Sequence, residues 1–87
     1  MNDRKKEIDN RLATIEGHLR SVRKMLDEDR YCVDILKQTY AIERALHKVE
    51  AAILEGHLQT CVPAGFKDGR DAEMTRELFE LFELSRR

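Results

Sequence analysis

Tryptophan is absent from this sequence, proline occurs once and cysteine only twice. Two cysteines allow one disulfide at most, which excludes the disulfide-rich scaffolds of many short secreted domains. The sequence also lacks an apolar run of about 18 residues, so we predict no membrane-spanning helix. Its first ten residues, MNDRKKEIDN, contain no apolar secretion core, and we expect a cytoplasmic protein. In that reducing compartment, paired cysteines more often bind metal or react than form structural disulfides.

An excess of charge of one sign is missing too, because 16 basic and 17 acidic residues nearly cancel. The distribution is uneven, however: residues 1–24 hold seven bases and four acids, a local net charge of +3. A near-neutral chain does not by itself indicate nucleic-acid binding. A basic face that is repeated by symmetry in an oligomer could still provide it.

What the sequence contains is two long apolar seams with helical spacing, which predict an all-α fold and a single domain over 1–87. We predict helices over about 3–26, 31–61 and 70–85, of which the first two form an antiparallel hairpin. Pro63 should end the second helix, residues 64–69 should form a loop, and Asp68 or Asp71 should cap the third helix. The seam of the first helix consists of Ile8, Leu12, Ile15, Leu19, Val22 and Leu26, and that of the second of Ile35, Thr39, Ile42, Leu46, Val49 and Ile53.

Three residues of the second helix could carry chemistry: Cys32, His57 and Cys61. His57 and Cys61 are four apart, so they project from one helical face, while Cys32 lies at the other end. Cys32 and Cys61 are 29 residues apart, or roughly 43 Å along a straight helix. One chain therefore cannot close the site, but an antiparallel partner helix would bring Cys32 to His57 and Cys61 of a second copy. The spacing predicts a homodimer with two intersubunit sites.

Two thiolates and one imidazole form a soft, three-ligand set. Soft thiolates select Cu(I), zinc or iron–sulfur clusters, and structural zinc usually requires four ligands. Cu(I) fits best. A cysteine taken alone is more often a small buried hydrophobe than a ligand, and the bases of the first helix can be interpreted as only a solvated face. We interpret His18 as an interface or packing residue and His47 as exposed.

Several short segments resemble the copper-sensitive operon repressor (CsoR) family, and its copper-sensing branch in particular. The matching segments are Arg11-Leu12, Gly17-His18-Leu19, Met25-Leu26, the run from Tyr31 to Gln38, and the run from His57 to Cys61. The resemblance covers about residues 5–84. It implies a three-helix protomer, an antiparallel dimer and a disc-shaped homotetramer that binds operator DNA when metal-free. Cu(I) would then release the DNA and derepress copper export or storage genes.

The resemblance also implies roles for individual residues. Cys32, His57 and Cys61 match the copper ligands, and Tyr31 and Glu77 match a pair that hydrogen-bonds around the metal. Basic faces of the first two helices would contact DNA phosphates. Their candidate residues are Arg4, Lys5, Lys6, Arg11, Arg44 and Lys48.

Two other functions remain open. A repressor that senses persulfide or oxidant would use Cys32 and Cys61 as a reactive pair and would not need His57. A copper-buffering helical assembly would bind no DNA. Enzyme function is not expected, because the sequence offers no nucleophile–base pair, paired carboxylates or phosphate loop.

Overall fold

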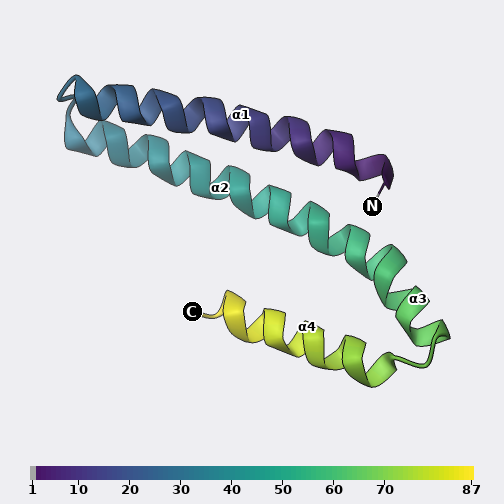
Figure 1. The fold of residues 1–87 in the computed structure, drawn as a ribbon. Coiled ribbons are helices and arrows are strands. Elements are labelled where there is room, and N and C mark those ends of the chain that lie inside the picture. The colour runs from purple at the N-terminus through teal and green to yellow at the C-terminus, as the bar shows by residue number, and fades with distance from the viewer. Residues whose placement is uncertain (1) are drawn as a thin grey trace. The chain divides into compact units, whose positions relative to one another are not determined.

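The computed structural model describes residues 2–87, and these are almost entirely helical (Figure 1). The elements are α1 (Asn2–Asp27), α2 (Cys32–Gly56), the π-helix η1 (His57–Cys61), α3 (Val62–Lys67) and α4 (Asp71–Ser85). The all-α prediction is confirmed. Within 2–87, no helix is long and apolar enough to cross a membrane. The chain divides into two compact units, residues 1–54 and 55–87.

The first unit is a hairpin in which α1 lies alongside α2 (Figure 1). Its core joins Ile8 and Ile15 of α1 to Ile42 and Val49 of α2, all less than 8% exposed. Each pair is seven residues apart, so two turns of helix separate successive contacts on the same face. The faces that carry these four residues are the ones along which the two helices meet.

Of the first predicted seam, Ile8 and Ile15 are buried and Val22 is partly buried. The intervening residues Leu12, Leu19 and Leu26 are 36%, 47% and 67% exposed. Exposed leucines at every seventh position form an apolar stripe on α1 that α2 does not cover. Within one chain, α2 therefore covers only part of the apolar seam predicted for the first helix.

The hairpin turn carries an unusual backbone angle at Asp29, whose φ is 55°. The Arg30 N–H donates to the Met25 carbonyl at 3.0 Å, and the Asp29 N–H donates to the Leu26 carbonyl at 3.1 Å. These two bonds form a Schellman motif that closes α1, with Asp29 at the left-handed position that glycine usually occupies. Aspartate tolerates this region better than most residues do.

The prediction that Pro63 ends the second helix, with a loop over 64–69, is wrong. The chain stays helical through α3, and Pro63 lies in the first turn of that helix. A proline ring collides with the carbonyl four residues earlier in a regular α-helix, here that of Gln59. The turn before it is widened instead: the Val62 N–H donates to the His57 carbonyl, five residues back. Because the π-turn changes the carbonyl positions ahead of Pro63, helical structure can continue past the proline.

In the second unit, α3 and α4 meet where Gly65 is buried against Met74, which is 4% exposed. A Schellman motif at Gly69, whose φ is 75°, closes α3. The third predicted helix is confirmed as α4, but its expected cap is not: the N-cap residue is Arg70, and no side chain caps it. Of the apolar residues of α4, Met74 is buried, whereas Leu81 and Phe82 are 47% and 56% exposed.

Candidate functional site

The first predicted metal ligand, Cys32, is the first residue of α2 in the 1–54 unit. Its thiol is free and exposed. Tyr31, which precedes it, is 67% exposed, so neither side chain is held in the interior of its unit. Both remain accessible to a metal ion or to a second polypeptide.

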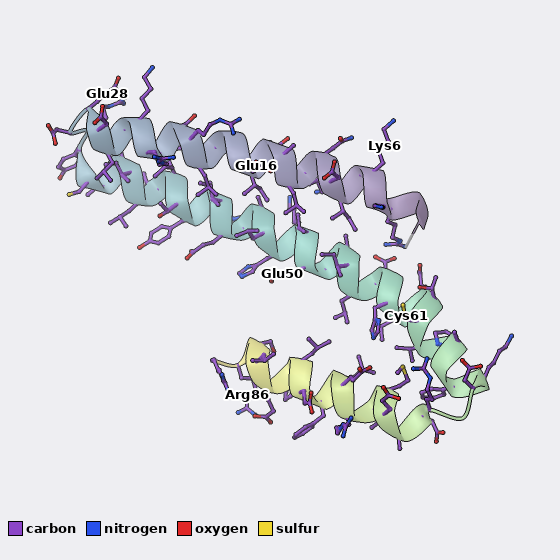
Figure 2. The ribbon with its side chains drawn as sticks, viewed as in Figure 1. Lys6, Glu16, Glu28, Glu50, Cys61 and Arg86 are labelled. Carbon is purple, nitrogen blue, oxygen red and sulfur yellow. The ribbon has the colours of Figure 1, made fainter. Side chains whose placement is uncertain are left out.

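The other two predicted ligands bound the π-turn. His57 is the first residue of η1 and is half-buried. Cys61 is the last residue of η1 and is exposed, with a free thiol (Figure 2). The α-helical geometry predicted for this pair is therefore wrong: the wider π-turn rotates the two side chains relative to each other. Single π-turns are rare and frequently occur at functional sites. This one coincides with the histidine–cysteine pair.

Thr60 contacts the sulfur of Cys61 from within the same π-turn. Its Oγ1 donates to the Gly56 carbonyl at 2.7 Å and lies 3.7 Å from the Cys61 Sγ. A hydroxyl has one proton to donate, and the shorter distance favours the carbonyl. The same group could turn toward a cysteine sulfur that carries negative charge. Sequence reasoning missed Thr60, although its position directly before Cys61 was a usable signal.

The three predicted metal ligands are not all found in one compact unit of the chain. Over residues 2–87, no group of three histidine, cysteine, aspartate or glutamate side chains could hold a metal ion. Cys32 belongs to one compact unit, and His57 and Cys61 belong to the other. Similarly, Tyr31 lies in the first unit and the half-buried Glu77 in the second.

A second site lies wholly within the first unit, in a groove of about 280 Å³ between α1 and α2. The residues that line it are Arg11, Thr14, Ile15 and His18 from α1 and Ala41, Arg44, Ala45 and Lys48 from α2. The two alanines leave room beside the cationic side chains. No carboxylate is among these lining residues, so the groove presents positive charge in a concave setting.

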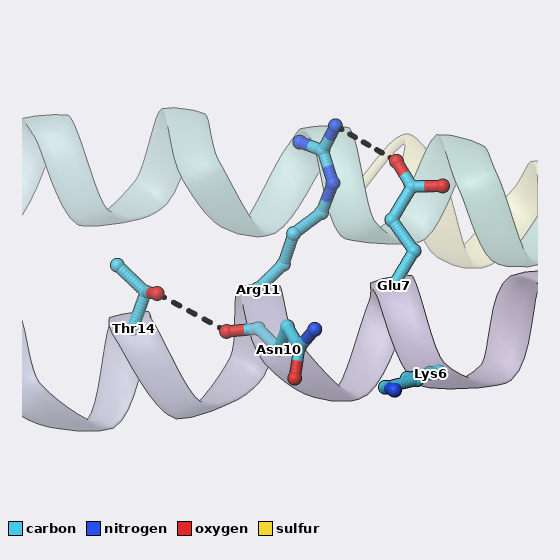
Figure 3. Close-up of a pocket in the computed structure, with 5 residues that line it drawn as sticks. All are labelled: Lys6, Glu7, Asn10, Arg11 and Thr14. Atoms are coloured by element: carbon cyan, nitrogen blue, oxygen red, sulfur yellow. Dashed lines mark hydrogen bonds and ion pairs between the residues drawn. The ribbon is translucent and has the colours of Figure 1, made fainter.

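An adjoining hollow of about 550 Å³ runs along α1 and shares Arg11 and Thr14 with the groove (Figure 3). Arg11 Nη2 lies 3.2 Å from Glu7 Oε1, and Thr14 Oγ1 donates to the Asn10 carbonyl at 3.1 Å. Lys6 lines this hollow as well. The shared residues join the two hollows into one polar surface.

Four of the six predicted DNA-contacting residues line this surface: Arg11, Arg44 and Lys48 in the groove, and Lys6 beside it. Arg4 and Lys5 line neither hollow among the residues that the structure describes. His18 also lines the groove, although it was not among the six predicted DNA-contacting residues. It is not packed inside the hairpin as one interpretation expected, but is exposed in the groove. Its place seven residues after Arg11 puts the two on one helical face, a signal already present in the sequence.

Comparison with known proteins agrees with this picture. Residues 4–84 match the family model of the metal-sensitive transcriptional repressors. The copper-sensing transcriptional repressor CsoR of Bacillus subtilis (strain 168) is 41% identical over 78 residues, which cover 90% of this chain and 77% of that protein. CsoR of Mycobacterium ulcerans (strain Agy99) is 39% identical over 80 residues, which cover 92% of this chain and 68% of that protein.

Two solved structures are similar as well. The crystal structure of the copper-sensing repressor CsoR with Cu(I) from Geobacillus thermodenitrificans NG80-2 has a TM-score of 0.93 and 36% identity, covering 100% of this chain and 91% of that one. The nickel-responsive transcriptional regulator InrS has a TM-score of 0.75 and 35% identity, covering 90% and 88% of the two chains. These two similar structures are named for different metals. Similarity of fold therefore does not identify the metal, and the donor atoms of the site must do so.

Proposed function

Because this chain belongs to the metal-sensitive transcriptional repressor family, we propose that it is a Cu(I)-responsive repressor. Metal-free protein binds operator DNA, and Cu(I) bound by Cys32, His57 and Cys61 releases it. The choice of Cu(I) rests on the donor atoms, because two free thiols and one imidazole are soft ligands that suit this ion. The two thiolates would supply negative charge, and the imidazole would supply a third donor atom.

The metal centre forms between two copies of the chain, in a homodimer that pairs further into a tetramer. Two observations support this assembly: a single chain gathers no three-ligand set within residues 2–87, and Leu12, Leu19 and Leu26 leave an apolar stripe on α1 exposed. A second copy would cover apolar surface and supply the missing ligand. Tyr31 and Glu77 would hydrogen-bond to the ligand residues, orient them and connect them to α4.

The groove between α1 and α2 is the proposed surface for DNA phosphates. Arg11, Arg44 and Lys48 line it, and Lys6 extends the surface along α1. Lys6 and His18 are twelve residues apart, which corresponds to about 18 Å of helix. Since each DNA strand presents a phosphate about every 3.4 Å of helix axis, this surface matches about five phosphates. Such contacts position the protein on the duplex and do not read its sequence.

The effects of Cu(I) and DNA on each other's binding must be equal. If Cu(I) lowers the affinity of the protein for DNA, then DNA lowers its affinity for Cu(I) by the same factor. The copper ligands occupy both ends of the helical segment that begins with α2, and the groove lies on α2 between them. Closing Cys32 of one copy onto the π-turn of another would strain or rotate α2. Because Arg44 and Lys48 lie on α2, that movement would misplace two of the cations that hold DNA.

An anaerobic titration tests this function. Reduced, metal-free protein is bound to a fluorescent duplex that spans the region upstream of its own gene, and anisotropy is followed as Cu(I) is added. We expect DNA release to be complete at one Cu(I) per protomer. His57→Ala should abolish the response, and the matched control His47→Ala, on the exposed surface of α2, should retain it.

Each other outcome replaces the proposal with a different function. Tight copper binding without DNA release would indicate a copper-buffering protein. Release by a persulfide donor that persists in His57→Ala, combined with weak copper binding, would indicate a thiol-based sensor.

A further inference from the structure

Of the histidines in the described residues 2–87, His18 alone lines the groove between α1 and α2, which we call the basic groove. It is exposed on α1, and the charged side chains that line the groove with it are Arg11 from α1 and Arg44 and Lys48 from α2. We propose that His18 is a further phosphate-contacting residue, in addition to Arg11, Arg44 and Lys48 of the groove, and that it binds the DNA backbone in its protonated form. This inference rests on the proposed function and adds a residue and a pH dependence to it.

The helical spacing brings His18 within reach of the same DNA strand as its neighbours. Arg11 and His18 are seven residues apart on one face of α1, or about 10 Å along the helix axis. Arg44 and Lys48 lie one turn apart on α2, across the groove. A distance of about 10 Å spans about three phosphates of one strand, so the four side chains can contact neighbouring phosphates.

The surroundings of His18 explain why its charge should depend on DNA. The charged side chains that line the groove with it, among the residues described, are Arg11, Arg44 and Lys48. A bound phosphate would add an opposite charge beside the imidazole, and a nearby opposite charge favours the charged form of a titratable group. DNA binding is therefore coupled to proton uptake at His18. Its affinity should rise as the pH falls through the range in which histidines change charge.

The salt dependence of DNA binding measures this coupling. The metal-free protein is titrated with the same upstream duplex at several salt concentrations, at pH 6.0 and at pH 8.0. The slope of log affinity against log salt reports the number of phosphates neutralised, at about 0.9 for each. For the wild type, we expect the slope to be steeper at pH 6.0 than at pH 8.0 by about 0.9 for each protomer that contacts the duplex.

Three variants assign the effect to this residue. His18→Gln should show the shallower slope at both pH values, and His18→Arg, which is always charged, the steeper slope at both. His47→Gln should behave as the wild type, because His47 is exposed on α2 but lines neither hollow among the described residues.

The outcomes separate this inference from the proposed function. If His18→Gln keeps the wild-type difference between the two pH values, or if the wild type shows no such difference, the role of His18 is disproved while DNA binding stands. If the wild-type chain binds no duplex at either pH, the repressor function itself fails, and the role of His18 fails with it.

Discussion

The guanidinium of Arg11 is held by the carboxylate of Glu7, one turn earlier on α1, with 3.2 Å between Nη2 and Oε1 (Figure 3). Arg11 lines both the groove and the adjoining hollow. In the protein without DNA, this proposed phosphate-binding residue therefore forms an ion pair with a carboxylate. The two side chains are 47% and 65% exposed. An ion pair this accessible to water is weak, and a phosphate can displace the carboxylate.

Glu7→Gln should therefore strengthen DNA binding. The substitution removes one negative charge from the surface and releases Arg11, and we expect the affinity to rise about two- to five-fold, the range of an exposed ion pair. Anisotropy with the metal-free protein would measure it. Asp9→Asn is the matched control, because it removes the same charge from an exposed position of α1 that lines neither described hollow. Equal gains from both variants would show that net charge alone is responsible.

Thr60→Val should weaken Cu(I) binding while it preserves the shape of the side chain. The Thr60 hydroxyl lies 3.7 Å from the Cys61 sulfur, and partners that hydrogen-bond to metal ligands typically contribute about ten- to a hundred-fold in affinity. We expect a loss of about ten-fold in competition with a chromophoric Cu(I) chelator, and a shifted thiolate-to-copper absorption band. Thr60→Ser should restore both.

Thr75→Val provides the control for this experiment. Thr75 donates to the Asp71 carbonyl at 2.9 Å, the same kind of bond that Thr60 makes to Gly56, but without a neighbouring cysteine. If Thr75→Val lowered the copper affinity as much as Thr60→Val does, the effect would come from the helix and not from the sulfur.

Gly65→Ala should destabilise the second unit. A Cβ at position 65 would lie 2.7 Å from both Cγ and Sδ of Met74, closer than such atoms can approach. Overpacking of this kind costs about 1–3 kcal/mol, measured as a fall in the free energy of unfolding in urea at fixed protein concentration. Because Met74→Ala removes both atoms, the double variant should lose less stability than the sum of the single ones. Strict additivity would disprove the contact.

The two Schellman turns should respond oppositely to substitution. Asp29→Gly places glycine at a residue with φ of 55° and should raise the free energy of unfolding by about 0.5–1 kcal/mol. Gly69→Ala forces a side chain into φ of 75° and should lower it by about 1 kcal/mol. Thermal unfolding of both variants at one protein concentration would test this, and a stabilising Gly69→Ala would contradict the assignment of the second turn.

The sequence alone was sufficient for the helical class, the hairpin and the family, because each depends on local or repeating patterns. The apolar seams that contain Ile8 with Ile15 and Ile42 with Val49 repeat every seven residues, and such a repeat predicts two long paired helices without coordinates. The positions of Cys32, His57 and Cys61 can likewise be read as a soft ligand set without coordinates. Their role as ligands stays a prediction.

Tertiary structure decided the rest. Helix propensities predict that the helix ends at Pro63, whereas in the structure it widens to a π-turn at His57–Cys61 and continues. The propensities do not show this outcome, because it depends on the steric fit between the proline ring and the backbone carbonyls before it. Nor do they separate Ile15, buried by α2, from Leu19 four residues later, since both fit one seam. The position of His18 in the groove follows only from the packing of α1 against α2, because residues of both helices line the groove.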